Sequence, residues 1–99
     1  MSKVVTVFGK KKCAKCETTK RKIDHLLAKR GLASEVAFRF HDLDTPEGLA
    51  EGAFFDVGKV PTTIVSVDGS DRRRWDGELP HSEDVLAALT GDGFGATPD

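Results

Sequence analysis

The sequence is poor in several residue types that mark particular protein classes. Among its 99 residues it has no tyrosine, one tryptophan, one methionine and only two cysteines. It also lacks any apolar run near the roughly 20 residues that a membrane-spanning helix requires. The first residues, MSKVVTVFGKKKC, hold too short an apolar stretch for a signal peptide. We therefore expect no membrane association and a cytoplasmic location.

The length and composition fit one domain. The apolar fraction is 38% and the charged fraction 31%, as in soluble globular proteins. The sequence shows no internal repeat and no interdomain linker. We expect residues 1–91 to form the domain, residues 92–99 to be a flexible C-terminal tail, and the protein to be a monomer.

Charge is unevenly distributed, although the formal net charge is only −1. Residues 10–22 contain seven Lys or Arg and one acid, whereas residues 75–99 contain six acids and no Lys or Arg. This asymmetry predicts a charged face. The basic run and Arg72-Arg73-Arg74 lack an aromatic RNA-binding motif, and arginines on a strand alternate between its faces. We expect no nucleic-acid partner; an acidic protein partner accounts for the lysines at least as well.

The apolar pattern predicts the element order β-α-β-α-β-β-α. Strands are expected at residues 3–8, 34–41, 62–67 and 70–75, with Asp68-Gly69 as the turn of a hairpin. Helices are expected from residue 13 or 14 to Gly31, from 46 to about 55, and after a cap at Ser82. The first β-α-β unit implies parallel strands joined by a right-handed crossover. The pattern predicts an α/β fold with a four-stranded mixed sheet between helices.

The second helix contains two glycines, Gly48 and Gly52, that weaken it. Thr45 and Pro46 form a good helix start. The sequence predicts that this helix is held by packing of Leu49, Phe54 and Phe55.

The two cysteines stand between the end of a strand and the start of its crossover helix. A thiol at a helix N-terminus faces unpaired backbone N–H groups and the positive end of the helix dipole, which favour its thiolate. Lys12 and Lys15 flank Cys13 and should add to this effect. Cys16, one turn further, falls on the apolar stripe of the helix. The spacing predicts Cys13 as an exposed nucleophile and Cys16 as a sheltered resolving thiol.

Other roles for the cysteine pair fit less well. A permanent staple would close too short a loop to stabilise much, and a lone pair is unusual in a reducing compartment. A zinc site would need His25, His41 or His81, but no second ligand pair has finger-like spacing. A CxxC near a β-α-β pattern favours redox chemistry without a bound cofactor or metal. A non-catalytic metal- or cluster-binding module is the alternative of another class.

Three segments resemble the glutaredoxin branch of the thioredoxin fold over residues 3 to about 90. They are Cys13-Ala14-Lys15-Cys16, residues 60–62 (VPT) and residues 75–77 (WDG). Within this branch the chain is most similar to the NrdH-type redoxins. The segments that show this similarity are CETTKR, residues 16–21, and WDGELP, residues 75–80.

The resemblance implies a cis peptide bond before Pro61 and a substrate groove. The backbone of Val60 would lie beside the thiols and pair with an extended substrate. Trp75 either contributes to the groove or packs in the core as a strand-end residue. The residues expected to shape the groove are Val60, Pro61, Thr62, Trp75, Asp76 and Gly77.

The resemblance also implies partners. NrdH-type redoxins reduce protein disulfides, are reduced by thioredoxin reductase and pass electrons to ribonucleotide reductase. Asp76 and Glu78 place two negative charges where glutaredoxins hold the anionic γ-glutamyl end of glutathione, which disfavours glutathione here. Residues 10–12 (KKK) could nevertheless supply a cation, so a glutathione-dependent glutaredoxin is the alternative.

Overall fold

The computed structural model describes residues 2–90, so the tail expected at 92–99 lies outside the described residues. The predicted element order is confirmed. The strands are β1 (Lys3–Gly9), β2 (Val36–Asp42), β3 (Thr62–Val67) and β4 (Ser70–Asp76). The helices are α1 (Ala14–Lys29), α2 (Pro46–Phe54) and α3 (Ser82–Thr90).

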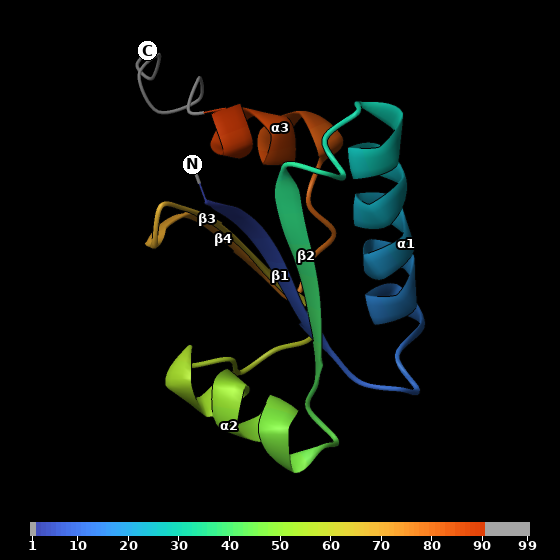
Figure 1. The fold of residues 1–99 in the computed structure, drawn as a ribbon. Coiled ribbons are helices and arrows are strands. Elements are labelled where there is room, and N and C mark those ends of the chain that lie inside the picture. Colours follow the sequence, from blue (N-terminus) through green and yellow to red (C-terminus); the bar gives the residue numbers. More distant parts are fainter. Residues whose placement is uncertain (1, 91–99) are drawn as a thin grey trace.

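The four strands form one mixed sheet in the order β2-β1-β3-β4. β1 runs parallel to β2, and β3 runs antiparallel to both β1 and β4. The hairpin turn lies at Asp68 and Gly69, which both have positive φ, as the sequence predicted. Figure 1 shows α1 and α3 on one side of the sheet and α2 on the other. The predicted fold class is confirmed.

The main core lies between the sheet and the pair α1 and α3. It is built from apolar side chains that alternate toward this face from the strands and recur along one stripe of each helix. Its buried members include Val5, Val7, Ile23, Leu26, Leu27, Val36, Val65, Trp75, Val85, Ala88 and Leu89. Within residues 2–90, every helix is too short or too polar to traverse a bilayer.

The packing expected for α2 is wrong for two of its three residues. Leu49 is 61% exposed and Phe54 is 80% exposed. Gly48 and Gly52 are the buried positions of this helix instead. Phe55, just beyond the helix, does pack, because its ring centroid lies 5.8 Å from that of buried Phe8.

The two glycines explain how α2 approaches the sheet. A Cβ at Gly48 would overlap the backbone carbonyl of Asp42, and one at Gly52 would lie 2.6 Å from a methyl of Leu43. At Gly48 the helix therefore packs on the backbone at the end of β2, and at Gly52 it packs on the side chain of Leu43, the residue after β2. This arrangement leaves Leu49 at the surface.

The helix starts agree with the sequence at α2 and differ by one residue at α3. The Thr45 hydroxyl accepts the N–H of Gly48, and Pro46 opens α2. α3 begins at Ser82 itself, and the carbonyl of His81 accepts the N–H groups of Asp84 and Val85. The cap predicted at Ser82 is therefore wrong by one position.

Candidate active site

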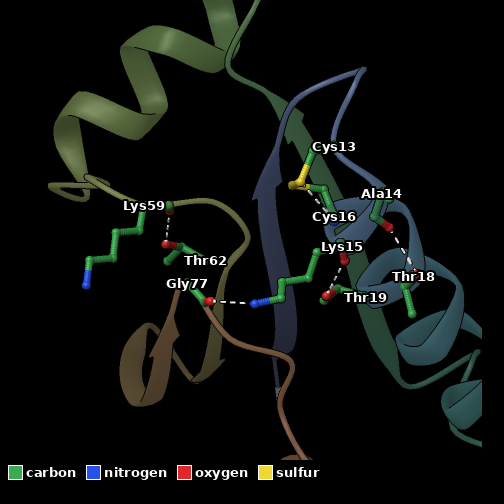
Figure 2. Close-up of a disulfide and its surroundings, with 9 residues drawn as sticks. All are labelled: Cys13, Ala14, Lys15, Cys16, Thr18, Thr19, Lys59, Thr62 and Gly77. Atoms are coloured by element: carbon green, nitrogen blue, oxygen red, sulfur yellow. Dashed lines mark hydrogen bonds between the residues drawn. A yellow bond between two sulfur atoms is a disulfide. The ribbon is translucent and has the colours of Figure 1, made fainter.

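The two cysteines are joined in a disulfide at the N-terminus of α1, with their Cα atoms 5.2 Å apart (Figure 2). Cys13 is the N-cap of the helix, and its Sγ accepts the backbone N–H of Cys16 at 3.1 Å. Cys13 is half-buried, whereas Cys16 is completely buried. An incoming sulfur can therefore reach Cys13 more easily than Cys16, as the sequence predicted.

The end of β1 makes room for the buried cysteine. A Cβ at Gly9 would lie 2.8 Å from the Cβ of Cys16, 3.0 Å from its Sγ and 3.1 Å from the ring of Phe40. The N–H of Cys13 donates to the Lys10 carbonyl at 3.3 Å, which closes the turn before the helix. Gly9 is thus a site residue that the sequence did not indicate, because only the fold brings it against Cys16.

The two lysines expected to tune the thiolate have different surroundings. Lys12 is exposed. The ammonium of Lys15 donates to the Gly77 carbonyl at 3.3 Å, and Figure 2 shows this side chain reaching from α1 to the segment after β4. Lys15 therefore links the cysteine helix to that segment, a contact between residues 62 positions apart.

Gly77 joins the cysteine helix to the turn before β3. The peptide bond between Val60 and Pro61 is cis, which confirms what the resemblance implied. The N–H of Gly77 donates to the Pro61 carbonyl at 2.8 Å, while the Gly77 carbonyl accepts Lys15. With φ of +75°, Gly77 has a backbone conformation that favours glycine. The structure thus brings together Val60, Pro61, Gly77 and Lys15.

Two residues expected in the groove turn their side chains inward. Thr62 is fully buried, and its hydroxyl donates to the Lys59 carbonyl at 2.6 Å. Trp75 is 5% exposed and belongs to the main core, with the Arg73 guanidinium 5.1 Å from its ring centroid. Both side chains are therefore buried, and Trp75 packs in the core, as the second of the two expectations for it had it.

Asp76 is exposed but not isolated. Its carboxylate accepts the Nε of Arg74 at 2.9 Å and lies 3.3 Å from the Thr62 hydroxyl. Arg74 in turn donates to the backbone carbonyls of Phe55 and Asp56. The local charge of Asp76 is therefore balanced, and the argument against glutathione depends on Glu78.

The three histidines considered as zinc ligands lie in different surroundings. Within residues 2–90, no group of three or more His, Cys, Asp or Glu side chains is placed to hold a metal ion. The ring of His41 stacks on Phe8, with centroids 5.1 Å apart. His25 and His81 are exposed.

A hollow of about 280 Å³ lies beside the cysteine loop, residues 10–13, which joins β1 to α1. The cysteine loop contributes Lys10 and the cis-proline turn contributes Val60, so the hollow adjoins the proposed groove. Its lining is Lys10, Leu43, Asp44, Leu49, Val57, Gly58, Lys59 and Val60. Sequence reasoning missed it because it placed Leu49 in the core.

No protein-family model matches the sequence, and no curated protein is significantly similar to it. Solved structures do match. A malarial protein superposes with a TM-score of 0.75 at 24% identity, covering 92% of this chain and 97% of the other. Thioredoxin-2, described as a component of the malaria parasite protein secretion machinery, gives 0.74 at 26% identity, covering 91% and 82%. Fasciola hepatica thioredoxin gives 0.70 at 23% identity, covering 91% and 80%.

These likenesses show that the chain has the thioredoxin fold. They favour no particular branch, so the narrower likeness to NrdH-type redoxins stays a prediction. Combined with the Cys13–Cys16 disulfide at the start of α1, the thioredoxin-like neighbours support the assignment of this protein as a thiol–disulfide oxidoreductase.

Proposed function

We propose that this protein reduces protein disulfides through Cys13 and Cys16 and acts as an electron carrier of the NrdH-redoxin type. The observation that carries the proposal is the asymmetry of the pair, with a half-buried Cys13 capping α1 and a fully buried Cys16 behind it. In the reduced protein, the helix N-terminus and the N–H of Cys16 favour the thiolate of Cys13.

In the first step, the Cys13 thiolate attacks one sulfur of the substrate disulfide. A bond forms between Cys13 and this sulfur while the substrate S–S bond breaks. The other substrate sulfur leaves as a thiolate and takes a proton from water.

In the second step, Cys16 loses its proton and its thiolate attacks the Sγ of Cys13. The Cys13–Cys16 bond forms as the mixed disulfide breaks, and the remaining substrate sulfur leaves and is protonated. The substrate has gained two electrons and two protons. The protein is left with the disulfide that the structure contains.

The cis-proline turn would align the substrate. Val60 is half-buried and lines the hollow beside the cysteine loop, so an extended chain could pair with its backbone. Gly77, bonded to the Pro61 carbonyl, supports the other side of the turn. Lys12 and Lys15 would add positive charge near the thiolate, and Asp76 would fix the end of β4 through Arg74.

We propose thioredoxin reductase as the electron source and ribonucleotide reductase as one recipient, on the basis of the resemblance in CETTKR and WDGELP. The exposed carboxylate of Glu78, beside Gly77, disfavours glutathione. The competing function is that of a glutathione-dependent glutaredoxin.

The test measures NADPH consumption by the oxidised protein with two regenerating systems. One is thioredoxin reductase, and the other is glutathione with glutathione reductase. Rapid turnover with thioredoxin reductase alone supports the proposal, and reduced protein can then be tested with ribonucleotide reductase. If only the glutathione system gives turnover, the protein has the glutaredoxin function instead of the proposed one. If dithiothreitol reduces the disulfide but neither system gives turnover, neither thioredoxin reductase nor glutathione is the reductant.

A further inference from the structure

The hollow beside the cysteine loop combines an apolar surface with a basic rim. Leu49, Val57 and Val60 contribute apolar side chains to its lining. Leu49 is 61% exposed, although it is a large aliphatic residue in the middle of α2. Covering this side chain with another apolar group would remove both surfaces from water, which favours association.

The rim of the hollow is basic because two lysines from segments distant in the sequence line it. Lys10 belongs to the cysteine loop and Lys59 precedes the cis-proline turn, and both line the hollow and are exposed. Among the described residues that line the hollow, Asp44 is the one acid. Three further exposed lysines, Lys11, Lys12 and Lys15, lie in and just after the cysteine loop.

Within residues 2–90, none of these five lysines forms an ion pair with an acidic side chain. The ion pairs found in that part of the chain include those of Arg73 with Asp84 and of Arg74 with Asp76. An uncompensated positive rim attracts acidic chains and speeds their approach. Lys11 and Lys12 directly precede Cys13 in the chain, so a segment that brings its disulfide to Cys13 comes close to these positive charges.

We propose that the hollow is a specificity site for the substrate segment next to the reacting cysteine. The hollow receives an apolar side chain of that segment, and the lysine rim selects segments that carry Asp or Glu nearby. The substrate class is then an acidic protein with an aliphatic or aromatic residue close to its disulfide. The inference rests on the proposed disulfide reduction and adds its substrate preference.

A substrate segment in extended conformation can place a side chain in the hollow while its backbone pairs with Val60. If its backbone pairs with Val60, alternate side chains project to opposite sides of the segment. One of these sides faces the hollow, which Val60 itself lines. The residues two positions before and after the apolar side chain, which flank it on this side, then lie within reach of Lys10 and Lys59.

The test uses four synthetic peptides, each with one intramolecular disulfide. They place either Leu or Ser beside a cysteine and either Glu or Lys at the flanking positions. Reduction by prereduced protein is followed by chromatography under single-turnover conditions. The peptide with Leu and Glu is expected to react fastest, and its advantage over the peptide with Leu and Lys should shrink as salt is added.

Two matched pairs of variants locate the preference. Leu49→Ser should lower the Leu-over-Ser preference roughly fivefold, because the lost contact is apolar burial. Phe54→Ser removes an apolar residue of the same helix that is still more exposed, at 80%, and does not line this hollow, so the preference should persist. The double variant Lys10→Gln, Lys59→Gln should lower the Glu-over-Lys preference about fourfold. The control Lys29→Gln, at the far end of α1, should leave this preference unchanged.

The outcomes separate this inference from the proposed function. If all four peptides are reduced at the same rate, disulfide reduction stands and the specificity site is wrong. The site is also wrong if Leu49→Ser and Phe54→Ser change the preference equally. If none of the peptides is reduced by prereduced protein, the proposed function itself fails.

Discussion

Gly9 lies directly against Cys16, so closely that a Cβ at position 9 would come within 2.8 Å of the Cβ of that cysteine. Cβ atoms in proteins essentially never come this close to another heavy atom. Gly9, at the end of β1, and Cys16, in the first turn of α1, are both buried. The last residue of the strand therefore determines where the resolving sulfur can sit.

Gly9→Ala should displace the start of α1. We expect the oxidised protein to lose about 1–3 kcal/mol of unfolding free energy, as overpacked sites do, and disulfide reduction to slow. Guanidinium denaturation measures the first effect and a single-turnover assay the second. Gly58→Ala is the control for stability, because a Cβ there meets open space. Equal stability of the two variants would contradict the close packing.

The two buried glycines of α2 should differ in their tolerance of alanine. At Gly48 the new Cβ meets the backbone of Asp42, which cannot move without shifting β2, whereas at Gly52 it meets the end of the Leu43 side chain. Gly48→Ala should therefore destabilise the protein by more than Gly52→Ala, by about 1 kcal/mol or more. Denaturation midpoints of the two variants provide the measurement. The reverse order would mean that α2 meets the sheet through other residues.

Asp76 and Glu78 offer a matched pair of acids. Asp76→Ala removes the acceptor of the Arg74 Nε–H, the arginine that ties β4 to the carbonyls of Phe55 and Asp56, which should cost about 1 kcal/mol of stability. Glu78→Ala removes an exposed carboxylate and should change stability by less than about 0.5 kcal/mol. Thermal and chemical unfolding of both variants test this difference, and an equal loss would contradict the anchoring role of Asp76.

Glu78 should also influence the choice of reductant. Replacing it with Ser removes the exposed carboxylate next to Gly77, which pairs with no arginine within residues 2–90, so glutathione-dependent turnover should rise about threefold. The rate with thioredoxin reductase serves as the reference in the same preparation. An unchanged glutathione rate would show that another feature excludes glutathione.

The element order and the redox pair were accessible from the sequence because each depends on local pattern. A run of β-branched residues predicted β1, and the Asp68-Gly69 turn predicted the hairpin of β3 and β4. The apolar stripe of the helix predicted the burial of Cys16, whereas Cys13, predicted to be exposed, is half-buried. The cis bond before Pro61 came from the resemblance, since composition around a proline does not determine its isomer.

Features that depend on contacts between distant elements could not be predicted. Hydrophobicity placed Leu49 and Phe54 in the core, but close approach of α2 to β2 requires the absence of side chains, and glycines supply it. No spacing rule links Lys15 to Gly77, because the fold alone joins α1 to the segment after β4. Trp75 lies in the core since its position on β4 faces α3 rather than solvent.

The most direct test of the redox assignment is to trap the mixed disulfide. Cys16→Ser and Cys16→Ala, reduced and mixed with a disulfide-bonded protein such as insulin, should each form a stable adduct through Cys13 and lose turnover. Mass spectrometry of the intact adduct and of its tryptic peptides identifies the linked cysteine, while Cys13→Ser should form no adduct and reduce nothing. Full turnover by either Cys16 variant, or an adduct formed by Cys13→Ser, would contradict the proposed roles of the two cysteines.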